Sequence, residues 1–423
     1  MVTLASILPG GILFLRFLNI AAYTSTDITL SFRKTMADSH ILFFEPRNEG
    51  HHLMSLHHVA EGLLEAGHQL TLAIDLRTDD ARNILFRKNP TLISSTEQTN
   101  AYGPDGQFRS GSEIQALRDI FLESEADTAF IDSLDGFISK FLRRAALGMD
   151  PPIELKGHLG GIYNHPKWFP PEFSSLNNWL KKKGFARLSR EGWFGSLLIL
   201  SEYYINGLQR DYPDTDFVFL PEPGQRPKGS RQDARNYFGL PDDAIVLLNY
   251  GVGHRRKGLH LVTEAMRRID SPRLFLFSAG RHNKDLATRD EAIELEKLGR
   301  AKVIDRYITE EEEALCYLAC DYVLAPYLSH YCSSNVLALA VLAGRPTIAS
   351  DYDLIGRRVK DRKLGVLFRD RSVDDLTEKL REIAQITGDP VEPYAANLAA
   401  YAEELTVESY RAALQTAFPN GST

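Results

Sequence analysis

The chain has 423 residues, of which 43% are hydrophobic and 25% charged, values typical of a globular protein rather than a disordered or fibrous one. A single hydrophobic core stops growing at roughly 250–300 residues, so this length predicts two domains with a cleft between them. The formal net charge of −7 argues against nucleic acid as a partner. Three cysteines are too few for a disulfide framework, and we expect a cytoplasmic protein.

Residues 1–38 differ in composition from the rest of the chain. The first 23 residues are apolar with Arg16 as their single charge, and no acidic residue precedes Asp27. This stretch is short and broken for a membrane span. Three interpretations stay open: a signal or anchor segment, a targeting peptide, or an over-long start that precedes a native first residue at Met36. We favour the last and treat this segment as an extension.

Residues 39–220 are expected to form a first α/β domain. Strand-like apolar runs at 39–45 and 69–75 flank an amphipathic helical run, which is one strand-helix-strand unit. We expect residues 80–150 to be mostly helical around a short apolar run at 129–131. Further buried strands are predicted at 152–157 and 197–201.

A second domain over residues 225–400 follows a linker. Residues 217–229 contain three prolines and two glycines, which indicates a connection. Six apolar runs then alternate with helical patterns, which predicts a parallel sheet covered on both faces. Such sheets bind ligands at the carboxyl ends of their strands. The runs are 244–250, 274–279, 302–305, 321–326, 346–350 and 364–368.

The loop after the first of these strands has the composition of an anion site. Residues 251–258, GVGHRRKG, offer Gly253 for close approach of the backbone and Arg255, Arg256 and Lys257 to neutralise charge before a helix. This pattern predicts a diphosphate site. The alternative is a solvated basic turn, and the spacing is not that of a Walker loop.

A second anion site is predicted before the helix expected from Ser334. Ser333 can cap this helix, whose first turn offers the N–H groups of Ser334, Asn335 and Val336. Because both loops follow strands of one sheet, they can hold one diphosphate from two sides. The alternative is an ordinary capped core helix.

These residues carry a family resemblance. They belong to four motifs in the second half: RKG (256–258), SAG (278–280), ACDYVLAPY (319–327) and AGRPTIAS (343–350). With these motifs, the second half resembles the nucleotide-binding domain of GT-B type retaining glycosyltransferases, the large glycosyltransferase group 1 family. The resemblance implies two doubly wound Rossmann-like domains facing a central cleft, with the acceptor bound by residues 39–220 and the nucleotide sugar by 225–400. It also implies that the C-terminal helix in 401–423 crosses back to the first domain.

The function that this resemblance implies is transfer of a hexose from a nucleotide sugar to a hydroxyl of a glycan, glycolipid or small metabolite, with retention. Arg256 and Lys257 would hold the donor diphosphate, with Arg255 as an alternate. This scheme needs no cofactor and no metal ion, because electrostatic stabilisation of the departing diphosphate does the main work.

The chain departs from the family at two glutamates. The family carries them eight positions apart, one near the transferred sugar and one on the ribose, and here those positions hold Tyr331 and Leu339. Leucine cannot accept a hydrogen bond from ribose. A divergent enzyme and a non-catalytic relative that binds a sugar, nucleotide or partner both stay open, and a nucleotide-sugar epimerase is a third interpretation.

Histidines are the catalytic candidates of the first domain. Residues 46–75 are similar to the opening strand, loop and helix of GT-B proteins, which places Gly50, His51 and His52 in a loop facing the cleft. His158 follows the strand predicted at 152–157, where related enzymes have a histidine beside the transferred sugar. We therefore name His158 and His51 as catalytic candidates. The alternative is loop or surface histidines held by the backbone.

Two other patterns carry less weight. Cys316 and Cys320, with His330 and Cys332 beyond, lack a second ligand pair of zinc spacing, which favours core cysteines. Residues 178–190 mix Trp179 and Phe185 with five cations, which suits peripheral contact with the inner face of a membrane. The alternative for this run is a solvated helix face.

Overall fold

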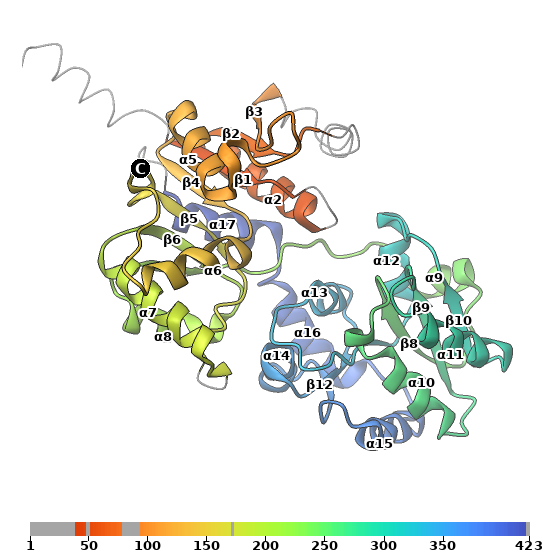
Figure 1. Ribbon diagram of the computed structural model, residues 1–423. Helices are drawn as coiled ribbons and strands as arrows, with labels where there is room; N and C mark the ends of the chain where they lie inside the picture. Colours follow the sequence, from red (N-terminus) through yellow and green to blue (C-terminus); the bar gives the residue numbers. More distant parts are fainter. Residues whose placement is uncertain (1–38, 48–50, 78–93, 171–172, 420–423) are drawn as a thin grey trace, which may run out of the picture.

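The computed structural model describes residues 39–47, 51–77, 94–170 and 173–419, with side chains from residue 56 onward in the second range. It contains two parallel β-sheets, each with helices against its faces (Figure 1). This confirms the predicted α/β class with two doubly wound, Rossmann-like sheets. The extension over residues 1–38 lies outside the described residues. Within the described ranges, every helix is too short or too polar to pass through a lipid bilayer.

The first sheet has seven parallel strands in the order β3-β2-β1-β4-β5-β6-β7. The order reverses between β1 and β4, and such a reversal leaves a crevice at the carboxyl ends of the two strands. Most of the strands are short apolar runs buried on both faces, as expected under two layers of helices. They are β1 (His40–Glu45), β2 (Gln69–Ile74), β3 (Glu97–Asn100), β4 (Thr128–Ile131), β5 (Leu159–Tyr163), β6 (Phe194–Ile199) and β7 (Asp216–Phe219).

The last helix of the chain packs on this first sheet. On α17, Leu414 is fully buried, and its Cδ1 would lie 2.6 Å from a Cβ added to Gly62 of α2. Arg411 also pairs with Glu65 of α2 at 2.9 Å. The helices around the first sheet are α2 (His51–Glu65), η1 (Arg109–Gly111), α5 (Glu113–Ser124), α6 (Leu134–Ala145), η2 (Ile153–Leu155), α7 (Leu176–Arg190), α8 (Glu202–Asp211) and α17 (Val407–Ala417).

The second sheet has six parallel strands in the order β10-β9-β8-β11-β12-β13. All six predicted apolar runs form strands: β8 (Ile245–Tyr250), β9 (Leu274–Ala279), β10 (Ala301–Ile304), β11 (Tyr322–Ala325), β12 (Thr347–Ser350) and β13 (Gly365–Phe368). The helices that go with them are α9 (Arg231–Phe238), η4 (Arg255–Lys257), α10 (Leu259–Arg267), α11 (Leu286–Lys297), α12 (Glu310–Ala319), α13 (Asn335–Leu342), α14 (Asp353–Asp361), α15 (Val373–Ala384), η5 (Glu392–Tyr394) and α16 (Ala395–Ala402).

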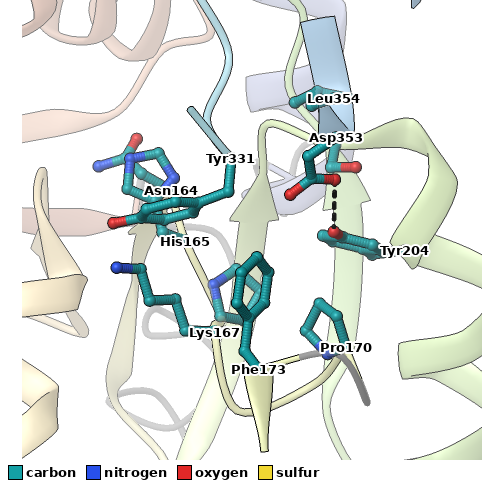
Figure 2. Close-up of a pocket in the computed structure, with 11 residues that line it drawn as sticks. Asn164, His165, Lys167, Pro170, Phe173, Tyr204, Tyr331, Asp353 and Leu354 are labelled. Atoms are coloured by element: carbon teal, nitrogen blue, oxygen red, sulfur yellow. Dashed lines mark hydrogen bonds between the residues drawn. The ribbon is translucent and has the colours of Figure 1, made fainter. Parts of the chain in front are cut away.

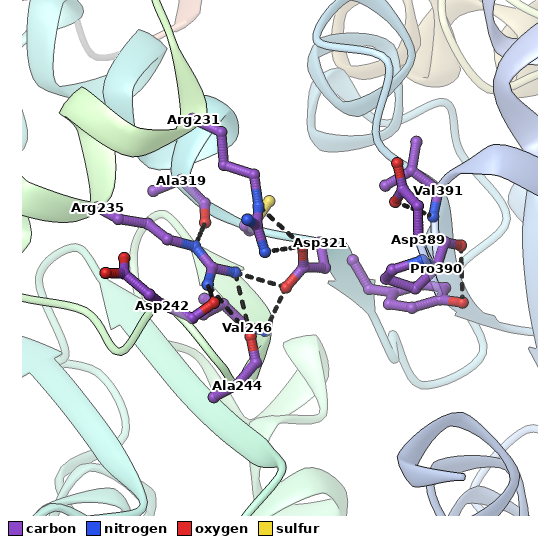
Figure 3. Close-up of polar contacts among 12 residues, drawn as sticks. Arg231, Arg235, Asp242, Ala244, Val246, Ala319, Asp321, Asp389, Pro390 and Val391 are labelled. Atoms are coloured by element: carbon purple, nitrogen blue, oxygen red, sulfur yellow. Dashed lines mark hydrogen bonds and ion pairs between the residues drawn. The ribbon is translucent and has the colours of Figure 1, made fainter. Parts of the chain in front are cut away.

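A buried polar cluster fixes α9 to this sheet (Figure 3). The carboxylate of Asp321, just before β11, accepts from Arg235 at 2.6 Å and from the backbone N–H of Val246 in β8 at 2.7 Å. Arg231 donates to the same carboxylate at 2.8 Å, and Arg235 also donates to the Ala319 carbonyl at 3.0 Å. Because every buried charge is paired, the cluster is structural. The aspartate of the ACDYVLAPY motif therefore holds the sheet together.

The strand predicted at residues 152–157 is wrong. Pro152 has no N–H to donate to a sheet, residues 153–155 form the 3-10 turn η2, and Gly157 has a φ of 86°. The strand of this region is β5, which begins at Leu159. Residues 80–150 also contain β3, a half-exposed strand of polar residues that lacks the apolar signal of its neighbours.

A buried arginine joins the two sheets. Arg358 of α14 is 1% exposed and donates to Glu222, in the connection between the sheets, at 3.0 Å. The same guanidinium donates to Glu202 of α8 at 2.8 Å and to the Leu200 carbonyl at 2.8 Å. The second sheet is thereby linked to the carboxyl end of β6 in the first.

Candidate functional site

The loop after β8 lies tightly against two neighbouring loops. A Cβ on Gly253 would lie 2.7 Å from Nδ1 of His282, which follows β9. Gly258 has a φ of 74°, and a Cβ there would lie 1.8 Å from the carbonyl oxygen of Pro326, which follows β11. Only glycine allows this approach. The packing places η4 at the carboxyl edge of the sheet, beside the loop that leads to α13.

Two adjacent cations in η4 lack acidic partners. The Lys257 ammonium donates to the Tyr250 carbonyl at 3.3 Å, and Nη1 of Arg256 lies 2.6 Å from Nδ1 of His330. Neither side chain has a carboxylate within ion-pair distance in the described part of the chain. Burial, followed by the charge of Arg256, lowers the pKa of Lys257 to about 8. This pair of cations favours binding of an anion. Arg255 instead donates to Thr288 of α11 at 3.5 Å and is not part of the pair.

The N-cap of helix α13 lies one residue after Ser333, the residue predicted to cap it. Its N-cap is Ser334, and the Ser333 hydroxyl accepts from Arg358 at 2.7 Å instead of capping the helix. The prediction that Ser333 caps is therefore wrong, because a buried guanidinium takes its oxygen. The first N–H groups of the helix, including those of Asn335 and Val336, have no intrahelical partner. They stay available to an anion.

The structure brings the two predicted anion loops together. The backbone N–H of Leu328, after β11, donates to the carbonyl of Arg256 at 2.8 Å, and β8 and β11 are neighbours in the sheet. His330 lies between Arg256 and the α13 loop. Burial and the charge of Arg256 lower its pKa to about 4, so it is neutral at pH 7. Gly253, Arg256, Lys257 and the start of α13 thus share one edge.

His158 does not lie at the cleft. It precedes β5 at the amino edge of the sheet, its Nδ1 is 2.7 Å from the Asp127 carbonyl, and its ring packs on Phe121. The prediction failed because it rested on a strand at 152–157. With β5 starting at Leu159, a histidine that follows this strand must come after Tyr163.

His165 is the histidine that follows β5. The Asp135 carboxylate, in the first turn of α6, accepts from the backbone N–H groups of His165 at 2.6 Å and Asn164 at 2.8 Å. The pKa of His165 is lowered to about 4, mainly by burial, with smaller contributions from the charges of Lys167 and Arg256. Its Nδ1 is buried and makes no hydrogen bond within the described residues. Sequence reasoning missed this residue, although the rule that places a histidine after a strand finds it once β5 is placed correctly.

The two halves of the molecule meet at Tyr331 (Figure 2). The Lys167 ammonium lies 3.6 Å from the centre of the Tyr331 ring, and the rings of His165 and Phe173 lie 5.2 and 5.6 Å from it. The cavity between these residues has a volume of about 10 Å³, roughly what one water molecule needs. A sugar therefore enters here only if Tyr331 or the two halves move apart.

The two positions of the family glutamates differ in their surroundings. Tyr331 faces the cleft, whereas Leu339 is half-buried in α13 and packs against the apolar core below β8. Another carboxylate lies at the carboxyl edge of the second sheet. It belongs to Glu313 of α12, which is hydrogen-bonded to the Tyr250 side chain at the end of β8. Burial raises the pKa of Glu313.

The remaining candidates either lie outside the described residues or are buried in the core. Gly50 lies outside the described residues, as do the side chains of His51 and His52, whose backbone starts α2. Cys316 and Cys320 are buried in the core, as favoured from sequence. Across the described ranges, no three His, Cys, Asp or Glu side chains are placed to share a metal ion.

Known proteins share this architecture. Residues 230–404 match the model of the family described as Glycosyl transferases group 1. A glycosyltransferase from Rickettsia africae superposes with a TM-score of 0.63 at 11% identity, over 90% of this chain and 99% of that one. The chain has the GT-B fold.

Two further GT-B structures superpose over nearly the whole chain. Anabaena HepE, solved in complex with UDP, gives a TM-score of 0.63 at 13% identity, over 90% of this chain and 99% of that one. Sucrose-phosphate synthase from Thermosynechococcus elongatus superposes with a TM-score of 0.61 at 16% identity, over 89% of this chain and 97% of that one. No curated protein matches the sequence. The resemblance to group 1 glycosyltransferases is thus confirmed over the second sheet, and family and fold together support glycosyl transfer in general.

Proposed function

We propose that this protein moves a hexosyl group from a nucleotide sugar to a hydroxyl of a glycan, glycolipid or small metabolite, with retention. The observation that carries the proposal is the half-buried ammonium of Lys257, which lies beside the exposed Arg256 without an acidic partner in the described ranges. Partial loss of water around this ammonium disfavours its charge, as its lowered pKa indicates, and an anion bound beside it would offset that cost. A diphosphate places two anions against two adjacent cations and the start of α13. HepE, which shares the fold, was solved with UDP and with UDP-glucose.

The proposed chemistry is electrostatic. As the bond between the anomeric carbon and the phosphate oxygen breaks, Arg256, Lys257 and the N–H groups at the start of α13 stabilise the charge on the leaving diphosphate. The acceptor oxygen bonds to the same face of the sugar, and its proton passes to the leaving phosphate oxygen. These groups supply the charge stabilisation without a metal ion.

His165 is proposed to orient the transferred sugar. Its low pKa keeps the imidazole neutral, so it acts through hydrogen bonds rather than through charge. Asp135 fixes the backbone on which it sits, and the unpaired Nδ1 is left for a sugar hydroxyl.

The ribose is assigned to Glu313. Leu339 cannot accept a hydrogen bond, whereas the Glu313 carboxyl lies with Tyr250, whose carbonyl also contacts Lys257. This assignment places the ribose next to the diphosphate and on the α12 side of it.

Transfer is tested with UDP-, GDP-, ADP- and dTDP-hexoses and a panel of hydroxyl acceptors, by following nucleotide release and the anomeric proton of the product. The expected result is acceptor-dependent release from one donor, with the anomeric configuration kept and activity retained in EDTA. A product with inverted anomeric configuration would contradict the retaining scheme. Loss of activity in EDTA would contradict the proposal that no metal ion is needed.

A non-catalytic binding protein is the second candidate, favoured by the closure of the cleft around Tyr331. For this candidate, nucleotide binds to the Lys257 site while no donor in the panel is consumed. The variant Tyr331→Ala, which opens the cavity, distinguishes the two candidates. A transferase is expected to change its turnover, whereas a binding protein still consumes no donor.

A further inference from the structure

Positive charge is concentrated in one part of the first half. Residues 134–190 contain ten Lys and Arg against four Asp and Glu, whereas the rest of the chain has 39 against 52. This segment includes α6 and α7, which lie side by side on the outside of the first sheet (Figure 1). Their charge is thus opposite to that of the protein as a whole.

The outward side of α7 combines apolar and basic side chains. Gly184, Phe185 and Leu188 face the core, whereas Leu176 and Trp179 are 75% and 50% exposed. Lys183 continues the outward row, with its ammonium 4.1 Å from the centre of the Trp179 ring. Because these outward residues are spaced three and four apart, they form one stripe along the helix.

Helix α6 repeats the pattern next to it. Lys140 and Arg143 are exposed at the same spacing as Leu147, which is 68% exposed just beyond the helix. Arg143 donates to Asn177 of α7 at 3.1 Å, which joins the two stripes. We call this surface the α6–α7 face: Lys140, Arg143, Arg144, Leu147, Leu176, Trp179, Lys182, Lys183 and Arg190.

The cations of the α6–α7 face form no ion pairs in the described part of the chain, and Lys140 alone has a longer-range interaction with a carboxylate, that of Glu113. None of its six Lys and Arg side chains lies within ion-pair distance of a carboxylate anywhere in the described ranges. Arg187, in contrast, pairs with Asp150 at 2.5 Å and Glu191 at 2.8 Å, and we leave it out of the face. The face therefore presents an excess of positive charge around exposed Leu and Trp side chains.

The α6–α7 face adjoins the cleft. Phe173 lines the cavity at Tyr331, and α7 begins three residues later at Leu176. Lys167, which contacts Tyr331, lies in the same loop. The apolar end of α7 is thus the end nearest to the site of transfer.

We infer that the α6–α7 face docks on an anionic lipid bilayer and brings the cleft to a lipid-borne hydroxyl acceptor. Leu176 and Trp179 enter the interface, and the cations contact the headgroups. Docking is independent of the proposed function, whereas the choice of acceptor rests on it.

The docking test uses the full chain with neutral phosphatidylcholine vesicles and with vesicles containing phosphatidylglycerol. Trp168 and Trp193 are buried, so a blue shift of tryptophan fluorescence reports on Trp179. We expect sedimentation and a blue shift with anionic vesicles only, both weakened when salt is raised from 50 to 500 mM. Each cation at an anionic surface contributes roughly fivefold to partitioning, so Lys182→Glu/Lys183→Glu/Arg190→Glu should weaken it at least about a hundredfold.

The matched control reverses three exposed lysines elsewhere, Lys228→Glu/Lys297→Glu/Lys360→Glu, and should bind as the unmodified protein does. The docking proposal would be overturned if the protein bound neutral and anionic vesicles equally or bound neither. It would also be overturned if the two triple variants lost binding to the same extent. Tighter binding to a duplex DNA or RNA oligonucleotide, lost in the first variant only, would assign the face to nucleic acid instead.

The acceptor is tested by adding anionic glycolipid vesicles and a soluble sugar of the same headgroup. We expect the first triple variant to lose transfer to the vesicle acceptor while keeping transfer to the soluble one. Equal loss on both would contradict the link between docking and acceptor. No transfer to either acceptor, with vesicle binding intact, would overturn the proposed function and this acceptor assignment together, and leave docking standing.

Discussion

The guanidinium of Arg358 lies 3.0 Å from the carboxylate of Glu222, and both side chains are buried. This contact ties α14 to the connection between the sheets, and the same guanidinium holds the Ser333 hydroxyl before α13 at 2.7 Å. One buried charge thus sets both the relation of the two sheets and the loop that starts the anion site.

Arg358→Met is expected to destabilise the protein strongly. Removing one partner of a buried ion pair leaves an uncompensated charge, which costs about 3–5 kcal/mol. Denaturant unfolding followed by circular dichroism measures this. The control is Arg226→Met, which removes an exposed pair with Glu403 and should cost under about 1 kcal/mol. Similar losses in both variants would show that the Arg358 cluster is not the link between the sheets.

Lys257→Met is expected to stabilise the free protein while weakening nucleotide binding. Replacing a half-buried charge that has no ion-pair partner in the described ranges by an apolar side chain of similar size should add about 1–3 kcal/mol to the free energy of unfolding, a few degrees in Tm. Differential scanning fluorimetry without and with nucleotide measures both effects. A lower Tm in the free variant would mean that Lys257 has a structural partner.

Nucleotide binding should weaken as pH rises through about 8. The folded-state pKa of Lys257 lies below its ordinary value, so the ammonium that a diphosphate needs is lost above pH 8. The affinity should fall by up to about tenfold per pH unit above this value. In the free protein the sign is opposite: the cost of burying the charge disappears as pH rises from 8, so stability gains there. Titrations from pH 7 to 9.5 check this, and an equal slope in Lys257→Met would contradict it.

His165→Ala and His158→Ala form a matched pair at the two ends of β5. Losing a hydrogen-bond partner of the transferred sugar should lower kcat on the order of a hundredfold. His158 lies at the opposite edge, so His158→Ala should keep the unmodified kcat. Nucleotide affinity should be unchanged in both. A large effect of His158→Ala with none of His165→Ala would reverse the assignment.

Glu313→Gln tests the ribose contact. Its loss should weaken UDP binding about tenfold or more while leaving the affinity for pyrophosphate unchanged, since hydrogen bonds to charged groups contribute about 1.5 kcal/mol or more. Competition titrations with UDP and pyrophosphate provide the comparison. An equal loss for both ligands would place Glu313 at the diphosphate.

The sheets were predictable where apolar runs define buried strands, as in all six strands of the second sheet. The strand β3 was not predictable, because it is half-exposed and made of polar residues. The strand β5 was misplaced because the proline and glycine before it were read as part of a strand. That single error moved the cleft histidine from His165 to His158. The Arg358 contact joins residues 136 positions apart, which no local pattern reveals.

The most direct test of the central claim is a calorimetric titration of UDP, GDP, ADP and dTDP into the unmodified protein, Lys257→Ala and Arg255→Ala. Loss of one charge-assisted phosphate contact costs about 1.5–3 kcal/mol, roughly ten- to hundredfold in affinity. The account predicts micromolar binding of one nucleotide, this loss in Lys257→Ala, and none in Arg255→Ala. Absence of binding by all four nucleotides to the folded protein, or equal losses in both variants, would contradict it.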